Sequence, residues 1–256
     1  TMNSAHNEFA AGSTYTDSFT AATADGSTQV VTVNIAGTND AAVISGTRTI
    51  ELTENDAVLT ASGTLTSTDV DGDPNKFMRE TVDGTYGSLS MAQSGVWTYT
   101  AKSAQNQLST GAKASDSFVV HAADGTASTI TVTITGTNDA ATFDGKSTAT
   151  LTESNAVQTV SGTITATDVD SPNTFIAQSD VNGSNGYGTF SLDKFGNWTY
   201  TMSSAHNEFV KDVKYTDTFT AKTVDGSSKT ITVTIVGTND AALVSGTSTA
   251  SITETN

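Results

Sequence analysis

The chain has 256 residues, 27 of them acidic and 11 basic, which gives a formal net charge of −16 at pH 7. A chain this acidic lacks the clustered Lys and Arg that bind phosphates, which excludes nucleic acid and an anionic membrane surface as partners. It contains no cysteine and no apolar run near the ~18 residues of a membrane span, so neither disulfides nor membrane insertion is expected.

An internal repeat organises the chain from end to end. The tetrapeptide Gly-Thr-Asn-Asp occurs at 37–40, 136–139 and 237–240, at spacings of 99 and 101 residues. The first forty residues also match 201–240 closely. A period of this kind has to be recognised before a fold is assigned. We therefore expect a segment of a longer array, with four parts: the end of a truncated repeat (1–40), two complete repeats (41–140 and 141–240) and the start of another truncated repeat (241–256).

Alternating polar and apolar residues predict seven strands in the first complete repeat. Asp-Gly, Ser-Gly and Asn/Asp-rich turns separate them, which favours hairpins. The segment 102–110 lacks alternation and is predicted to form a short helical turn. Seven short antiparallel strands in about 100 residues are typical of an immunoglobulin-like sandwich. The predicted fold class is therefore all-β, with sandwiches arranged end to end and strands near 47–53, 59–68, 76–82, 87–91, 96–101, 115–122 and 129–135.

Aromatic residues recur at equivalent positions of the repeats. Trp97 and Trp198 lie in strands expected to face inward, so we interpret them as core residues and not as a stacking platform for a ligand. Tyr15 and Tyr215 begin the sixth strand of their repeats, where a tyrosine hydroxyl can fix a corner by hydrogen bonding. The middle repeat has Ala114 at that position.

Residues that could catalyse a reaction are sparse. His6 and His206 are equivalent, the middle repeat has Gln105 in their place, and His121 lies in a strand. A catalytic histidine needs an orienting partner and a nucleophile within hydrogen-bond reach, and no spacing here provides them. An enzyme embedded in the array would also need a non-repeated insertion with its own acids, which the sequence lacks. We therefore predict that the chain is not an enzyme.

The acidic residues gather at the two ends of each predicted sandwich. Strands alternate in direction, so every loop falls at the pole where the chain enters a repeat (the N-terminal pole) or at the pole where it leaves (the C-terminal pole). In an array, the C-terminal pole of one repeat faces the N-terminal pole of the next. In the first complete repeat, the C-terminal pole is predicted to carry Glu54, Asp116, Asn138 and Asp139, and the N-terminal pole Asp69, Asp71, Asp73 and Asp124.

Such a gathering of carboxylates is expected to hold a calcium ion, because like charges at close range repel unless a cation lies among them. Calcium takes six to eight oxygen ligands in flexible geometry, whereas zinc prefers His and Cys and magnesium keeps more water. A metal would also replace the missing disulfides as a staple. The predicted ligands are Asp17, Asn39, Asp40, Glu54, Asp69, Asp71, Asp73, Asp116, Asp124, Asn138, Asp139, Glu153, Asp168, Asp170, Asp217, Asp225, Asn239 and Asp240.

The alternative interpretation is that these Asp and Asn residues only form turns. We adopt it for Asp83, Asp180 and Asp193. Turn formation alone explains the groups of acids at the poles less well. A turn needs one such residue, whereas an Asp-x-Asp pair, a Glu and an Asn-Asp pair meet at the poles.

Several motifs resemble the VCBS-type repeats of giant bacterial RTX surface adhesins. The segments 35–42, 134–141 and 235–242 are similar to the linker of those repeats, and the Leu-Thr-Glu and Thr-Asp-Val-Asp elements follow in the same order. The arrangement of acids also resembles that of cadherins. One departure is Ser171-Pro172, where the second repeat lacks an equivalent of Asp73.

The resemblance implies secretion by a type I system, an extracellular location on a Gram-negative surface, calcium binding, and a role in adhesion or biofilm formation. We therefore expect cadherin-like extender repeats that calcium makes rigid and whose partners are calcium ions and neighbouring repeats. The alternative is that the repeats themselves bind a glycan or another copy of the adhesin, which exposed aromatic residues on one sheet face would favour.

Overall fold

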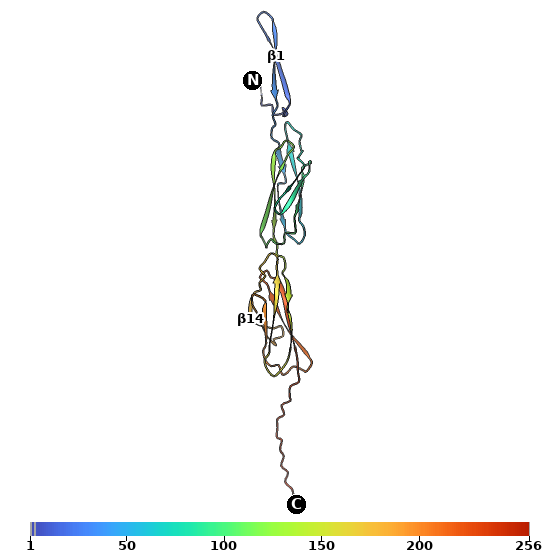
Figure 1. The fold of residues 1–256 in the computed structure, drawn as a ribbon, viewed down its shortest axis with the longest axis vertical. Coiled ribbons are helices and arrows are strands. Elements are labelled where there is room, and N and C mark those ends of the chain that lie inside the picture. Colours follow the sequence, from blue (N-terminus) through green and yellow to red (C-terminus); the bar gives the residue numbers. More distant parts are fainter. Residues whose placement is uncertain (1, 3, 256) are drawn as a thin grey trace. The chain divides into compact units, whose positions relative to one another are not determined.

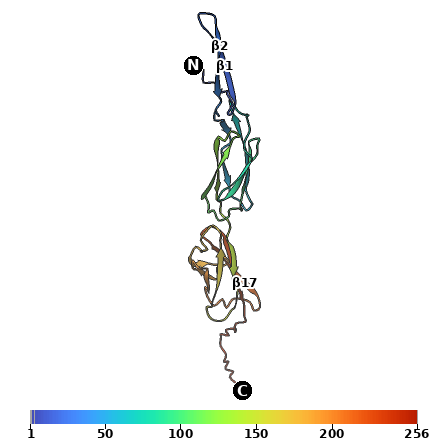
Figure 2. The ribbon, with the colours of Figure 1, turned by 45° about the horizontal axis from the view of Figure 1, so that its top comes forward.

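A computed structural model describes residue 2 and residues 4–255 of the chain. The outer limits of the first and last predicted segments, at Thr1 and Asn256, lie outside the described residues. The chain divides into two units, Thr1–Asn138 and Asp139–Asn256. Figures 1 and 2 show that both are built from strands and loops. The described residues include no helix with the length and apolar character needed to span a bilayer.

The first unit begins with a β-hairpin. Strand β1 (Thr14–Ala22) pairs antiparallel with β2 (Thr28–Ala36) over their full lengths. Apolar side chains that are buried in the complete repeats are exposed here, with Phe19 61% and Val33 50% exposed.

A two-layer sandwich follows in the first unit. Strands β3, β5, β8, β7 and β6 form a five-stranded sheet in that order, and β4, β10 and β9 form a three-stranded sheet. Thr and Ser alternate with apolar residues along these strands, so one face of each sheet turns inward and the other carries hydroxyl groups. The strands are β3 (Val43–Gly46), β4 (Thr49–Thr53), β5 (Thr60–Thr68), β6 (Glu80–Asp83), β7 (Gly87–Met91), β8 (Val96–Ala101), β9 (Lys113–His121) and β10 (Ala127–Thr135).

The second unit contains a sandwich of the same topology. Its five-stranded sheet has the order β11, β13, β16, β15, β14, and its three-stranded sheet the order β12, β18, β17. Residues 241–255 form neither helix nor strand. The strands are β11 (Thr142–Gly145), β12 (Thr148–Thr152), β13 (Thr159–Thr167), β14 (Gln178–Asn182), β15 (Gly188–Leu192), β16 (Asn197–Met202), β17 (Lys214–Lys222) and β18 (Ser228–Val236).

A buried tryptophan on the third strand of each five-stranded sheet anchors each core, as predicted. Trp97 is 0% and Trp198 1% exposed. The Trp97 ring lies against Gly63 of β5, where an added Cβ atom would come within 2.4 Å of the ring. The Trp97 Nε1–H donates to the carbonyl oxygen of Thr47 at 3.1 Å, so the buried indole nitrogen has an acceptor. The large Trp97 ring therefore requires a glycine at position 63 of the neighbouring strand.

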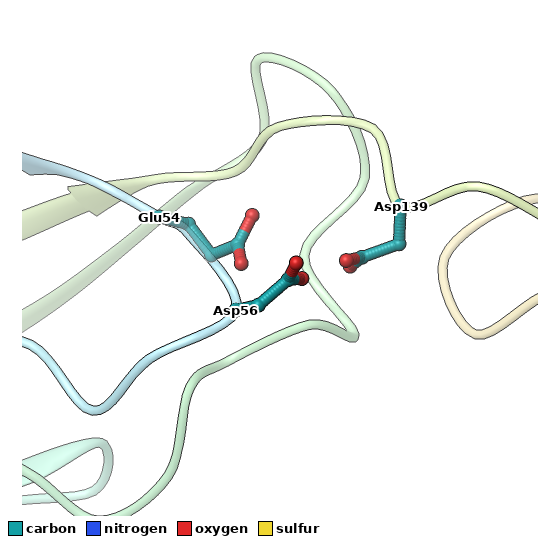
Figure 3. A group of neighbouring side chains, drawn as sticks. All are labelled: Glu54, Asp56 and Asp139. Carbon is teal, nitrogen blue, oxygen red and sulfur yellow. The ribbon is translucent and has the colours of Figure 1, made fainter.

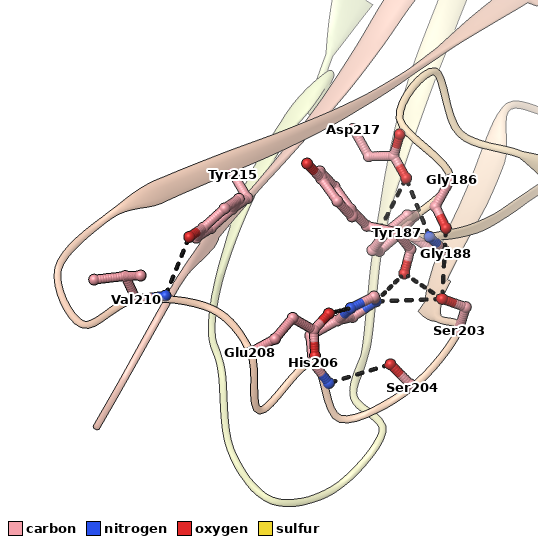
Figure 4. Close-up of polar contacts among 11 residues, drawn as sticks. Gly186, Tyr187, Gly188, Ser203, Ser204, His206, Glu208, Val210, Tyr215 and Asp217 are labelled. Carbon is pink, nitrogen blue, oxygen red and sulfur yellow. Dashed lines mark hydrogen bonds and ion pairs between the residues drawn. The ribbon is translucent and has the colours of Figure 1, made fainter. Parts of the chain in front are cut away.

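The predicted tyrosine corner is also confirmed. The Tyr15 hydroxyl accepts a hydrogen bond from the backbone N–H of Ala10 at 3.0 Å. The Tyr215 hydroxyl accepts one from Val210 at 3.1 Å (Figure 4). In both copies the hydroxyl satisfies a backbone donor in the loop before the strand.

The structure differs from the predicted elements in four places. The strand predicted over 47–53 is β4, and the short strand β3 that precedes it was not predicted; between them the chain turns at Gly46, whose φ is +112°, and moves to the other sheet. β4 pairs parallel with β10, not antiparallel. The segment 102–110 consists of turns and bends, and no helix forms there. In addition, only 80–83 of the strand predicted at 76–82 forms a ladder, with Phe77 in an isolated bridge.

The contact between Gly63 and Trp97 generates a prediction about stability. We expect Gly63→Ala to lower the unfolding free energy of the first sandwich by about 1–3 kcal/mol, because the added methyl group overpacks a filled core. Thermal unfolding followed by tryptophan fluorescence measures this effect. Ser62→Ala, at an exposed neighbour on the same strand, is the control, and equal midpoints for the two variants would contradict the prediction.

Candidate metal sites

A buried glutamate follows β4 at the C-terminal pole of the first sandwich. The Glu54 side chain is 2% exposed. Its Oε2 accepts hydrogen bonds from the Thr137 backbone N–H at 3.2 Å and from the Thr137 hydroxyl at 2.7 Å. Its Oε1 is buried and has no hydrogen-bond partner. A buried acceptor without a donor is costly, so a cation is the natural partner for this oxygen.

The second unit repeats this arrangement. Glu153 is also 2% exposed, and its Oε2 accepts from the Thr238 backbone N–H at 3.0 Å and from the Thr238 hydroxyl at 2.6 Å. Its Oε1 is again buried without a partner, as is Oδ2 of Asp240. In both repeats, therefore, the threonine of the Gly-Thr-Asn-Asp linker fixes one glutamate oxygen and leaves the other open to a ligand.

Three carboxylates meet near Glu54. One carboxylate oxygen from each of Glu54, Asp56 and the linker residue Asp139 lies within 4.8 Å of the others (Figure 3). The Asn106 side-chain amide donates to Asp56 Oδ1 at 3.3 Å. Asp56 was not among the predicted ligands. Its spacing two residues after Glu54, in the loop that leaves β4, was the available signal.

At the N-terminal pole of the first sandwich, Asp124 organises the loops. Its carboxylate accepts hydrogen bonds from the backbone N–H groups of Thr126 and Ala42, both at 3.0 Å, and from the Asn39 amide at 3.4 Å. Burial alone would raise the pKa of this carboxyl. The hydrogen bonds, chiefly from the Thr126 side chain and backbone, outweigh burial and hold the pKa at about 2. Asp124 therefore remains negatively charged under all ordinary conditions.

Two further acids share this pole. The Asp71 backbone N–H donates to Asp69 Oδ1 at 3.2 Å, and the Asp40 backbone N–H faces Asp71 Oδ1 at 3.3 Å. Burial raises the pKa of Asp69, and the neighbouring carboxylates of Asp71 and Asp124 raise it further. The structure thus brings together five predicted ligands: Asn39, Asp40, Asp69, Asp71 and Asp124.

The N-terminal pole of the second unit has the same construction. Asp168 Oδ1 accepts from the backbone N–H groups of Asp170 at 3.0 Å and Ser171 at 2.8 Å, whereas its Oδ2 is buried without a partner. Burial, together with a side-chain hydrogen bond and the charge of Asp168, raises the pKa of Asp170. Asp225 lies in the adjacent turn and accepts from the Ser227 hydroxyl at 2.5 Å. Its place matches that of Asp124.

Asp116 and Asp217 serve a different purpose. Asp116 accepts hydrogen bonds from three successive backbone N–H groups, at 2.7–2.9 Å, in the turn between β6 and β7. Asp217 likewise accepts from Asn185 at 2.7 Å and from the Tyr200 hydroxyl at 3.2 Å. It also accepts from the Gly188 N–H at 3.1 Å (Figure 4). These two carboxylates hold turns in place, and N–H donors already satisfy their oxygens. Their equivalent in the hairpin, Asp17, is exposed.

The remaining predicted ligands lie at the edges of these groups. Asp73 forms an exposed ion pair with Lys76 at 2.5 Å and is not hydrogen-bonded to the other acids of its pole. The side-chain amides of Asn39 and Asn239 each donate to the carbonyl oxygen of the following aspartate at 3.2 Å. Asn138 lies in the linker between Thr137 and Asp139.

A Ser-His-Glu arrangement in the second unit resembles a catalytic triad but does not fit one. His206 Nδ1 lies 2.7 Å from Glu208 Oε1, and its Nε2 lies 3.2 Å from the Ser203 hydroxyl (Figure 4). However, Nε2 is nearer, at 2.7 Å, to the carbonyl oxygen of Tyr187, which can only accept. Nε2 therefore donates there and cannot serve as a base. In the middle repeat, Gln105 Nε2 makes the same contact with Tyr86, so this position fastens a loop.

Fold and sites together define the class of protein: tandem all-β domains of about 100 residues, with carboxylates grouped at their poles. The family of bacterial cadherin-like domains matches the chain twice, over residues 39–136 and 138–237. The chain therefore belongs to this family, whose members are adhesion-type modules. A comparison with curated proteins found no match.

Several solved structures are similar to the chain at low sequence identity. Cadherin domains 3–6 of protocadherin gamma B2 are 10% identical, with 88% of this chain and 57% of that chain covered and a TM-score of 0.44. Domains EC22–24 of mouse cadherin-23 are 17% identical (78% and 67% covered, TM-score 0.44). A Ca2+-stabilized adhesin that helps an Antarctic bacterium bind ice is 16% identical (89% and 57% covered, TM-score 0.27). The chain spans less than two thirds of the first and third of these.

The hydrogen bonds of Asp116 predict how its removal affects stability. We expect Asp116→Ala to lower the unfolding free energy of the first sandwich by about 2–5 kcal/mol, because three backbone N–H groups of the turn lose the buried carboxylate that accepts from them. The loss should be the same in calcium and in chelator, as measured by chemical denaturation. Asp17→Ala, at the exposed equivalent, is the control. A loss that occurs only in calcium would instead identify Asp116 as a metal ligand.

Proposed function

We propose that the chain is a set of spacer repeats, made rigid by calcium, from a large bacterial surface adhesin. The observation that carries the proposal is the pair of buried glutamates, Glu54 and Glu153, each with one carboxylate oxygen that has no donor in the described structure. The same arrangement in two successive repeats indicates a device that serves the array as a whole.

Calcium is the cation that these donors fit best. Glu54, Asp56 and Asp139 offer carboxylate oxygens, with no thiolate or imidazole among them, and this argues against zinc. A group of carboxylates also suits the flexible coordination of calcium better than the strict octahedron of magnesium, which retains water. Calcium would neutralise the excess negative charge at each pole.

The linker is the part of the chain that calcium would control. Thr137 attaches the linker to Glu54, and Asp139 follows two residues later with its own carboxylate. An ion bound to both residues would restrict the backbone rotations between them. Such a restriction would turn a hinge of repelling acids into a stiff connection, which is the property that a spacer requires.

The setting of this spacer follows from the repeat motifs. The recurring linker at 35–42, 134–141 and 235–242 is similar to that of VCBS-type repeats in RTX adhesins, which type I systems secrete to Gram-negative surfaces. We therefore propose an extracellular role in cell adhesion or biofilm formation, in which the repeats hold a distal binding domain away from the cell.

Chelation of calcium tests the proposal directly. At free calcium of ~100 times Kd, binding to the folded state would add about 2.7 kcal/mol to the unfolding free energy. We expect EDTA to lower the melting temperature of the intact chain and to broaden its distance distribution in small-angle scattering. An unchanged melting temperature and an unchanged distribution would refute the proposal.

A variant of Glu54 tests separately whether its unpartnered carboxylate oxygen binds calcium. We expect Glu54→Gln to keep the bond to Thr137 but to reduce the calcium-dependent gain in stability and the number of calcium ions bound, because the orphaned oxygen loses its charge. Calorimetric titration with calcium measures both. Glu51→Gln, at an exposed glutamate on β4, is the matched control, and equal titrations of the two variants would contradict the assignment.

The raised pKa values of Asp69 and Asp170 predict a pH dependence. An acid with a raised pKa in the folded state binds its proton more tightly than in the unfolded state, so the stability of the calcium-free protein falls as pH rises through that window. Calcium must displace those protons. We therefore expect calcium affinity to increase as the pH rises from about 4, the ordinary pKa of an aspartate, towards neutrality, with proton release.

Calorimetry in two buffers of different ionisation enthalpy measures the released protons. Asp69→Asn should release fewer protons than the wild-type chain. Asp124 would contribute none, because its pKa of about 2 keeps it ionised throughout this range. A calcium affinity independent of pH over the same interval would contradict the prediction.

A further inference from the structure

The two complete repeats differ sharply at one turn. In the second repeat, β15 and β16 are joined through Asp193-Lys194-Phe195-Gly196-Asn197. The equivalent segment of the first repeat, between β7 and β8, is Ala92-Gln93-Ser94-Gly95-Val96. A carboxylate, a cation, an aromatic ring and an amide thus replace small, neutral or apolar side chains. Since the rest of the fold is shared, this local change calls for a function that only the second repeat has.

The backbone of the two turns is the same. Gly196 N–H donates to the Asp193 carbonyl at 3.1 Å, as Gly95 N–H does to Ala92 at 2.9 Å. The φ angles of the two glycines are +85° and +84°. The differences between the turns therefore lie in their side chains alone, and each turn can accept the sequence of the other.

A shallow polar pocket lies beside this turn in the second repeat. Its volume is about 290 Å3, close to the lower end of the ~300–1,000 Å3 of small-molecule pockets. The edge strand β14 opens one side of it, with an irregular register between Gln178 and Val181. The amide oxygen of Gln178 is buried without a hydrogen-bond partner. The pocket is lined by Gln178, Ser179, Ser191, Leu192, Asp193, Asn197 and Thr199.

The polar groups of the pocket are held in place before any ligand binds. Asp193 Oδ1 accepts from the backbone N–H groups of Phe195 and Asn197, both at 2.9 Å, and its Oδ2 accepts from the Asn197 amide at 2.8 Å. The Asn197 oxygen accepts from the Thr163 hydroxyl at 2.9 Å. The bond from the Asn197 side chain is the main cause that lowers the pKa of Asp193. The carboxylate and the amide each keep further bonding capacity for a ligand.

An exposed aromatic ring completes the patch. Phe195 lies in the turn between Asp193 and Asn197 and is 66% exposed, although burial of such a ring is normally favourable. The Lys194 ammonium lies 5.0 Å from the centre of the ring. Because the Phe195 backbone N–H donates to Asp193, the exposed ring belongs to the same turn as the carboxylate and amide of the pocket. This turn therefore offers both an apolar face and hydrogen-bonding groups.

We propose that the pocket and Phe195 form a binding site for one sugar residue of a neutral oligosaccharide. A sugar ring presents hydroxyl groups, which are donors and acceptors at once, and a face of C–H groups that packs on an aromatic ring. Asp193, Asn197 and Gln178 supply the polar contacts, and Phe195 supplies the stacking surface. The high negative charge of the chain opposes acidic glycans. The second repeat is then both a spacer and a weak lectin.

An array of neutral hexose and N-acetylhexosamine oligosaccharides, probed with the intact chain in calcium, tests the site. The decisive variant carries the turn of the first repeat: Asp193→Ala, Lys194→Gln, Phe195→Ser and Asn197→Val. We expect the wild-type chain to bind at least one neutral oligosaccharide and the variant to bind it at least about tenfold more weakly, a difference of about 1.4 kcal/mol. Calcium titration of the variant should match the wild type and verifies folding.

Phe195→Ser alone provides a second test that leaves the Asp193 hydrogen bonds intact, and it should also weaken binding. The proposal is overturned if no neutral oligosaccharide binds, if only acidic ones bind, or if the grafted turn binds as well as the original. Because calcium binding is measured in the same samples, failure of the sugar site is distinct from failure of the spacer function.

Discussion

One buried glutamate at the end of each sandwich is hydrogen-bonded to the linker that leaves it. Glu54 and Glu153 are placed by the parallel pairing of their strands with the last strand of the repeat, which brings the outgoing linker alongside. The linker threonine then satisfies one oxygen and leaves the other without a donor. A cation bound to the free oxygen, as proposed, would act directly on the linker, because the same glutamate is buried in the domain and hydrogen-bonded to the segment that leaves it.

The number of donors around each acid distinguishes a structural acid from a candidate ligand. Asp116 and Asp217 are buried, but backbone N–H groups donate hydrogen bonds to their carboxylate oxygens. Asp168 and Glu54 retain an oxygen with no donor. The sequence alone does not distinguish structural acids from candidate ligands, because both lie close to loops at the poles. The number of hydrogen bonds to each carboxylate oxygen separates Asp116 and Asp217 from Glu54 and Asp168.

Local patterns predicted the sandwich, the buried tryptophans and the tyrosine corner, because each depends on residues that are close in sequence or on simple alternation. Strand β3 was missed, because it has only four residues and a single buried side chain, too few for an alternating pattern. The direction of the β4–β10 pairing was missed too, because strands some 80 residues apart carry no local mark of direction. The hydrogen-bond partners of Asp116 could not be predicted for the same reason, because the turn that donates to it lies about 30 residues away.

The parallel pairing of β4 with β10 has a mechanical consequence. The chain enters the sandwich through the short strand β3, which leads into β4, and it leaves the sandwich directly after β10. Once β3 is detached, tension along the chain pulls the adjacent strands β4 and β10 in opposite directions along their length. The evenly spaced hydrogen bonds between Thr49–Thr53 and Thr131–Thr135 are then loaded in shear and share the force, whereas a hairpin opened from one end would lose them singly. Each repeat therefore has parallel strands that resist forced unfolding together.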